Sequence, residues 1–264
     1  MGSGDFGFNG LHSLNAVNNW IAVINSNLNA TSRTAYKATK VKFRGGVTDT
    51  IRRPFGPQLG IQLPETTLQI DETSIDFSQG SIVASTEPTH LAIQGDGWFA
   101  LSTGDAAAGN VVTYYSRDGE FHVVNNNGEL RLVHSTGLYL VTNQGAALEF
   151  DPTNDLVRVA NGGAGFNVTV FNETHLQGFN APNFLRFSRF GSTVFEVTGN
   201  ANDVAAYSVS TGAARVVAQS LETSNSSLTQ TLPELSLAQK FFSAVSKVIS
   251  VHQTNLDTVI NLIR

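Results

Sequence analysis

The sequence contains no cysteine, and this absence excludes several kinds of site. None of the 264 residues carries a thiol, so the fold cannot rest on disulfides or thiolate zinc ligands, and no cysteine nucleophile is available. A cysteine-free chain fits a protein that works outside the cytoplasm without disulfides, and it fits many cytosolic proteins equally well. Cysteine usage therefore leaves the compartment open.

Charged residues and long apolar runs are also scarce. Only 14% of the residues are charged and the net charge is −5, whereas 41% are hydrophobic, enough for a sizeable core. Asn, Ser, Thr and Gly are abundant, which is typical of β-rich structure with many turns. No segment reaches the roughly 18 apolar residues that span a bilayer, so we expect no stable membrane insertion.

The sequence also lacks the motifs of a signal peptide. The stretch MGSGDFGFNGLHSL has no basic region and no unbroken apolar run, unlike a cleaved secretory signal. If the protein leaves the cytoplasm, we expect export without a cleavable signal.

No motif indicates catalysis or a bound cofactor. The stretch GDGW lacks the third glycine of a nucleotide-binding loop and favours a turn between strands. The six histidines have no zinc-type spacing, and the Asp151, Asn154 and Asp155 group lacks the spacing of a calcium loop. The serine-hydrolase elbow is missing too. We therefore expect neither an enzyme nor a metal or cofactor site.

An apolar stripe of helical period lies near the N-terminus. Spacings of 3, 4, 3 and 4 predict a helix of about 20 residues, with its stripe at Leu14, Val17, Ile21, Ile24 and Leu28. Asparagines fill much of the remaining surface, and because they are poor helix formers, packing rather than propensity should stabilise this helix.

A second, longer stripe ends the sequence. It follows a heptad pattern through Leu228, Thr231, Leu235, Ala238, Phe242, Val245, Ile249, His252, Leu256, Val259 and Ile263. Ser224 or Asn225 could cap the helix, and Pro233 predicts either a start near Thr231 or a kink. Periodicity alone allows packing within the chain or between chains. The position of both stripes, flanking a β-rich middle, favours packing between chains.

The middle of the sequence, from about Thr67 to Val217, alternates apolar residues with turns. HLAIQGDGWFALS predicts two short strands about a turn, and EFHVVNNNGELRLVH predicts a hairpin about Asn127 and Gly128. The predicted fold class is α+β, with terminal helices that pair as a coiled-coil-like core around a middle domain of hairpins. The predicted divisions are an N-terminal helix and connector over 1–45, a β-rich domain over 46–217 and a C-terminal helix over 218–264.

Basic residues crowd into one short stretch of this slightly acidic chain. They are Arg33, Lys37, Lys40, Lys42, Arg44, Arg52 and Arg53. No aromatic platform accompanies them, so we expect no nucleic acid partner. Electrostatic matching to an acidic surface of an adjacent subunit is the favoured interpretation, and a plain solvated loop is the alternative.

Short sequence boxes follow one another along most of the chain. The first holds Asn27, Leu28, Tyr36, Lys37 and Phe43; the next two are DFSQGSIVASTEP and LAIQGDGWFAL; a hairpin box holds Arg117, Gly119, Phe121, Gly128, Leu130 and Gly137; FNAPNFLRF follows; and the last box opens with Leu221, Glu222, Ser224 and Asn225. In this order the sequence resembles the bacterial flagellar axial family of rod, hook and hook-basal body proteins, closest to the distal rod type. It departs at Ala30, Arg33, Ala35 and His90, as a divergent member would. Since Ala35 replaces a glycine, we expect the turn after the first helix to differ.

The resemblance implies a structural subunit. In this family the terminal helices pair and line a helical tube, while the β-rich part faces outward, and the tube transmits torque and conducts exported subunits. The implied partners are copies of the chain and neighbouring axial proteins, in the basal body, periplasm or an extracellular filament. The resemblance also implies that the termini order only on assembly. A hook-like surface filament and a monomeric secreted β-domain that binds another molecule are the alternatives.

Overall fold

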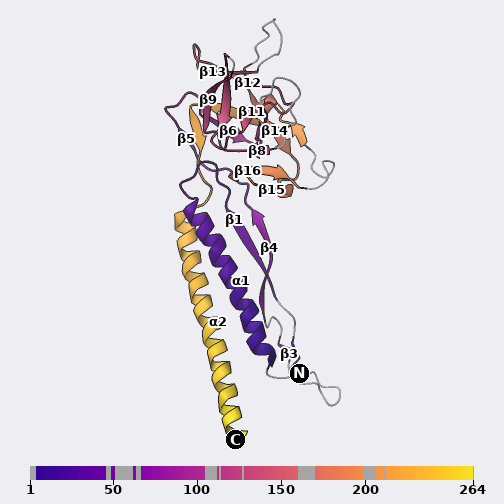
Figure 1. Ribbon diagram of the computed structural model, residues 1–264, viewed down its shortest axis with the longest axis vertical. Helices are drawn as coiled ribbons and strands as arrows, with labels where there is room; N and C mark the ends of the chain where they lie inside the picture. Colours follow the sequence, from indigo (N-terminus) through magenta and orange to yellow (C-terminus); the bar gives the residue numbers. More distant parts are fainter. Residues whose placement is uncertain are drawn as a thin grey trace. The chain divides into compact units, whose positions relative to one another are not determined.

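The computed structural model describes residues 4–45, 49–50, 62–63, 67–104, 112, 114–126, 128–159, 170–198, 206–210 and 212–263. The fold is α+β, with a helix near each end of the sequence and strands between them (Figure 1). The chain divides into two compact units. We call Met1–Asn29, Thr39–Asp76 and Ser226–Arg264 the helical unit, and Ala30–Ala38 with Phe77–Asn225 the strand unit.

Two long helices form the core of the helical unit. α1 (Gly4–Asn29) and α2 (Leu228–Ile263) lie side by side and run antiparallel (Figure 1). Near one end of the pair the Ser226 hydroxyl donates to the Asn27 carbonyl (3.0 Å), and further along Trp20 Nε1 donates to Glu234 Oε1 (2.8 Å). The predicted helices are therefore present. A coiled-coil form of their pairing stays a prediction.

Both helices differ in extent from the prediction. α1 begins about ten residues before Leu14, in a glycine-containing stretch with weak helix propensity. α2 begins at Leu228, where the Ser227 carbonyl accepts from the amides of Gln230 and Thr231. The predicted cap at Ser224 or Asn225 is therefore wrong. The predicted start near Thr231 is wrong too, because α2 begins three residues earlier and Pro233 lies beyond its first turn.

A two-stranded ribbon lies along α1 in the helical unit. It pairs β1 (Thr39–Gly45) with β4 (Leu68–Ile75), and a further short pair joins β2 (Asp49–Thr50) to β3 (Gln62–Leu63). The Trp20 and Phe43 rings meet edge to face at 5.1 Å, and the Leu68 amide donates to Ser13 Oγ (3.0 Å). One face of the ribbon therefore packs on α1, and the alternate side chains point away from it.

An antiparallel sheet of nine strands makes up most of the strand unit. Its order is β13-β12-β10-β11-β7-β8-β16-β15, with β9 on β10. The strands are β7 (Phe99–Ser102), β8 (Tyr114–Ser116), β9 (Phe121–Asn126), β10 (Glu129–His134), β11 (Tyr139–Val141), β12 (Leu148–Asp151), β13 (Leu156–Val159), β15 (Leu185–Ser188) and β16 (Gly191–Val197). The predicted hairpin about Gly128, which has a φ of +97°, is confirmed as β9 and β10.

Three short strand pairs and two 3₁₀ turns complete this unit. The pairs are β5 (Ile82–Ala84) with β19 (Ser220–Glu222), β6 (Leu91–Gly95) with β18 (Ala214–Ala218), and β14 (Gln177–Phe179) with β17 (Ala206–Ser208); the turns are η1 (Glu173–His175) and η2 (Pro182–Phe184). The two strands predicted around the Gly-Asp-Gly turn exist as β6 and β7. They do not pair with each other, because the turn at Gly95 and Gly97, both at positive φ, passes the chain from one sheet to another.

The unit boundaries differ from the predicted divisions at both ends. Residues 30–38 and 218–225 belong to the strand unit. The physical reason is burial, since Ala35, Lys37 and Glu222 have no exposed surface and β19 pairs with β5. The core of this unit includes Phe99 and Phe121, whose rings meet edge to face at 5.2 Å.

Candidate assembly surfaces

The predicted stripe of α1 faces its neighbours within the helical unit. Val17 and Ile24 are buried, and Leu14, Ile21 and Leu28 are half-buried. Ser13 and Ala16 are buried as well, although small and polar residues gave no apolar signal. Most of this stripe is therefore covered within the chain.

The predicted stripe of α2 is covered over its middle and open at its ends. Thr231 and Ala238 are buried; Leu235, Phe242, Val245, Ile249 and His252 are half-buried; and Leu228, Leu256 and Val259 are exposed. The side chain of Ile263 lies outside the described residues. The covered part coincides with the length of α2 that α1 accompanies in Figure 1.

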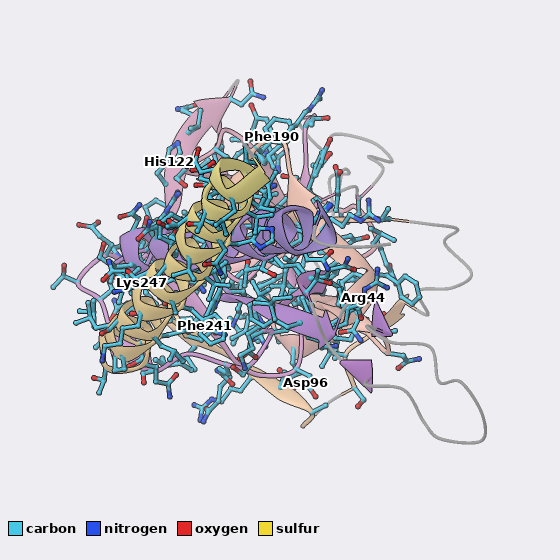
Figure 2. The ribbon with its side chains drawn as sticks, turned by 90° about the horizontal axis from the view of Figure 1, so that it is seen from below. Arg44, Asp96, His122, Phe190, Phe241 and Lys247 are labelled. Atoms are coloured by element: carbon cyan, nitrogen blue, oxygen red, sulfur yellow. The ribbon has the colours of Figure 1, made fainter. Side chains whose placement is uncertain are left out.

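A second apolar row on α2 was missed at the level of sequence. Leu237, Phe241, Ala244, Val248 and Val251 follow one another at spacings of 4, 3, 4 and 3, and we call them the outer seam. Phe241 is 46% exposed and Val248 66% exposed; Phe241 is labelled on α2 in Figure 2. The spacing of these residues is readable from the sequence, but the predicted heptad stripe covers only one of the two apolar rows of α2.

Charged residues from three sequence boxes meet inside the strand unit. Lys37 Nζ lies 2.6 Å from Glu222 Oε1, and neither side chain has exposed surface. The ammonium also donates to the Ser78 carbonyl (2.8 Å), and the same carboxylate oxygen accepts from the Gly80 amide (2.9 Å). A buried pair needs such additional hydrogen bonds to offset its desolvation.

Arg117 completes this buried charge cluster of Lys37, Arg117 and Glu222. Its guanidinium donates to the Gly95 carbonyl (2.8 Å), lies 5.5 Å from the centre of the Trp98 ring and approaches Glu222 Oε2 at 3.7 Å. Burial lowers the pKa of Arg117, and the Glu222 carboxylate opposes that shift. The Arg side chain stays charged because its ordinary pKa is so high.

Two asparagines of the boxes bind backbone groups. In the helical unit Asn27 Nδ2 donates to the Thr39 carbonyl (2.8 Å) and Asn27 Oδ1 accepts from the Thr39 amide (2.9 Å). In the strand unit Asn225 Oδ1 accepts from the Ala38 amide (2.7 Å), and Asn225 Nδ2 donates to the Ser78 carbonyl (3.1 Å). Each asparagine thus holds together chain segments that are distant in sequence.

Small residues in the boxes allow close backbone approach. A Cβ on Gly80 would lie 2.0 Å from the Thr223 carbonyl oxygen, and one on Gly119 would lie 1.6 Å from that of Leu91. Ala35 has a φ of +49° and donates its amide to the Glu222 carbonyl (2.8 Å). The backbone at Ala35 therefore adopts the left-handed conformation that a glycine adopts more cheaply.

The predicted basic patch is partly neutralised within the chain. Lys40 lies 2.6 Å from Asp76 and Arg44 lies 3.6 Å from Asp71, while Lys42 pairs with Glu72. Arg33 donates to Ser192 Oγ (3.1 Å) in the strand unit, and Arg52 and Arg53 lie outside the described residues. Lys37 is a correction, because a fully buried side chain cannot belong to a surface patch. The contact of the others with a neighbouring subunit stays a prediction.

Two features relevant to binding are absent from the described residues. No group of three His, Asp or Glu side chains there is placed to hold a metal ion. Among the described helices, none combines the length and apolar character required to cross a bilayer. Asp151 accepts from the Thr153 amide (2.9 Å) and from Asn154 Nδ2 (2.9 Å), which is the geometry of a capped turn.

Comparison with known proteins identifies the class. Residues 92–170 match the family described as flagellar hook protein FlgE/F/G D1 domain, and residues 217–262 match the flagellar basal body rod FlgEFG protein C-terminal family. Both are families of flagellar rod and hook proteins, which supports a divergent chain of that family.

Individual relatives support the rod type. The chain is 24% identical to a flagellar basal-body rod protein FlgG of Bacillus subtilis over 97% of its own length and 98% of the relative's. It is 27% identical to a flagellar basal-body rod protein FlgG of Borreliella burgdorferi over 92% of its own length and 93% of the relative's. It is 31% identical to a flagellar basal-body rod protein FlgF of Mesorhizobium japonicum over 59% of its own length and 58% of the relative's.

Proposed function

We propose that the chain is a structural subunit of the flagellar rod, located in the basal body, that polymerises into a helical tube. The outer seam is the observation that carries this proposal. Large apolar side chains at heptad spacing are left open along one helix, and such a surface marks an interaction site. A heterologous contact between copies that does not close produces an open filament.

The division into two units supports the same role. An elongated α1 and α2 pair suits the wall of a tube, and a β-rich unit suits contacts between neighbouring subunits on its outside. The tube would transmit torque and conduct exported subunits, with other axial proteins at its ends. The names of the relatives, basal-body rod proteins, support a structural role rather than a catalytic one.

Charged substitutions in the outer seam test the proposal. The Phe241→Glu and Val248→Glu double variant should keep the unfolding midpoint of the wild type, because both side chains are exposed, and should lose assembly. The matched control is Gln239→Glu, an exposed position on the opposite side of α2, which should assemble normally. Sedimentation velocity and negative-stain microscopy measure the assembly of each variant, and thermal unfolding measures its midpoint.

Each outcome has a distinct meaning. Assembly of the double variant at the wild-type concentration would contradict the role of the outer seam. Curved tubes from the wild type would favour a hook-like filament over a rod. Monomers of the wild type at every concentration would favour a monomeric β-domain that binds another molecule.

A further inference from the structure

The final turns of α2 extend past the partner helix. Gly10 of α1 lies against Ile249 of α2, so in an antiparallel pair the first described residue of α1 falls level with about residue 255 of α2. Figure 1 shows α2 running beyond the start of α1. We call residues 256–262 the overhang.

Four of the seven overhang residues are apolar, and all four are exposed. Leu256 is 37%, Val259 53%, Ile260 60% and Leu262 80% exposed. Leu256 and Val259 continue the heptad positions that α1 covers earlier along α2. The overhang therefore continues this helix–helix interface beyond the first described residue of α1.

An apolar pocket lies on the same helix pair. It has a volume of about 240 Å³, smaller than the roughly 300–1,000 Å³ of pockets for drug-sized ligands and suited to side chains of a packing helix. Its lining includes Asn9, Gly10 and Ser13 of α1 and Phe241, Ala244 and Val248 of α2. The pocket thus opens onto the outer seam.

Charges near the two surfaces are of opposite sign. Lys240 and Lys247 lie on either side of Ala244 along α2 and are exposed; Lys247 is labelled in Figure 2. The overhang carries Asp257 and no basic residue. If Val259 of one copy sat on Ala244 of a parallel copy, Asp257 would lie level with the helix between the two lysines.

We propose that the overhang of one subunit packs into the pocket on the α1 and α2 pair of the next copy of this chain. This inference rests on the proposed function and specifies its partner surface. The two copies would be offset by about 22 Å along the helix axis, the length of 15 residues at 1.5 Å each. The two contacting surfaces differ, so the contact is heterologous and extends indefinitely.

The absence of native cysteine makes disulfide trapping the direct test. The Ala244→Cys and Val259→Cys double variant, oxidised at assembling concentration, should give a ladder of dimers, trimers and longer covalent oligomers on a non-reducing gel. A mixture of the two single variants should stop at dimers. The control pairs Gln239→Cys with Val259→Cys and should stay monomeric, because position 239 lies on the opposite side of α2 from the outer seam.

The outcomes separate this inference from the proposed function. Filaments without a ladder overturn the inference and leave the proposed function standing, whereas monomers without a ladder overturn both. A dimer from Val259→Cys alone indicates symmetric pairing of overhangs and also overturns the inference. In support, Asp257→Lys should raise the critical concentration about two- to fivefold, and adding Lys240→Glu and Lys247→Glu should restore it.

Discussion

At the scale of single residues, the polar side chains of the sequence boxes act mainly on backbone groups of distant segments. Lys37, Arg117 and Asn225 bind backbone carbonyls and amides, and such hydrogen bonds offset the cost of burying polar groups. Lys37 and Asn225 each bind the Ser78 carbonyl. The strand unit is therefore closed by residues from both ends of its sequence.

Removing the charge of Glu222 should be strongly destabilising. Glu222→Gln leaves the Lys37 ammonium buried without its counter-charge, and such a change costs about 3–5 kcal/mol of unfolding free energy. The exposed pair of Lys42 and Glu72 offers a matched control, and Glu72→Gln should cost about 0–1 kcal/mol. Denaturant unfolding measures both variants. Equal losses would show that burial of the pair contributes nothing.

Ala35→Gly should stabilise the protein. A left-handed alanine costs roughly 1–2 kcal/mol, and the greater freedom of glycine in the unfolded chain offsets about 0.4–1 kcal/mol of that gain, so we expect a net gain of about 0.5–1 kcal/mol. Ala30 is also buried and has no positive φ, and Ala30→Gly should destabilise by about 0.5–1 kcal/mol. Thermal unfolding measures the stability change of each variant. A loss of stability in Ala35→Gly would contradict the argument from the left-handed backbone.

Asp118 should make stability depend on acid pH. Burial alone would raise the pKa of this carboxyl, but the hydrogen bond and charge of His134 and the Glu120 amide outweigh burial, so the pKa is lowered. A lowered folded-state pKa stabilises the protein above the unfolded value of about 3.9 and ceases to do so as pH falls through the folded pKa.

The isosteric Asp118→Asn variant isolates this effect. It should cost about 1–3 kcal/mol at pH 6, and the difference from wild type should shrink below about pH 4. Denaturant unfolding between pH 3 and pH 7 measures the difference. A difference in unfolding free energy that stays constant over this pH range would exclude titration of Asp118 as its source.

At the scale of elements, α1 shows why helix boundaries are hard to read from sequence. Its first ten residues carry glycines and little apolar periodicity, so helix propensity alone does not predict a helix there. A Cβ on Gly10 would lie 2.7 Å from Ile249 Cγ1, so the close approach of α2 depends on a missing side chain. Propensity rules count that glycine only as a helix breaker.

Substitution at Gly10 separates propensity from packing. At an open helical site, Gly→Ala raises the free energy of unfolding by about 1 kcal/mol. Gly10→Ala should leave this free energy unchanged or lower it, because Ile249 must move to make room for the new Cβ. Combining it with Ile249→Val should recover part of the gain and give a coupling free energy of about 0.5–1.5 kcal/mol in a double-mutant cycle. Additive effects in thermal unfolding would mean that the two residues do not contact.

The sequence predicted the periodic elements well and the pairing of non-local elements poorly. The stripes of α1 and α2 and the β9 and β10 hairpin depend on local spacing and are present. The pairing of β6 with β18 joins residues more than a hundred apart, which no local pattern encodes. The acids that pair with Lys40, Lys42 and Arg44, which lie in β4 and directly after it, were likewise invisible, since only the pairing of β1 with β4 brings them together.

At the scale of the whole molecule, each unit is assembled from segments that are separate in sequence. The strand unit takes residues 30–38 from before the ribbon and residues 218–225 from just before α2. A fragment of 46–217, the predicted domain, would lack both Lys37 and Glu222 and the β19 strand. The sequence boxes located these residues, but their meeting in one buried cluster required the fold.

The central claim is that the outer seam and the overhang are covered by further copies of this chain. Electron cryo-microscopy of the concentrated full-length protein tests it most directly. We expect helical tubes in which α1 and α2 form the inner wall and no large apolar residue of the outer seam faces solvent. Monomers at every concentration, with α2 uncovered as in the single chain, would contradict the account.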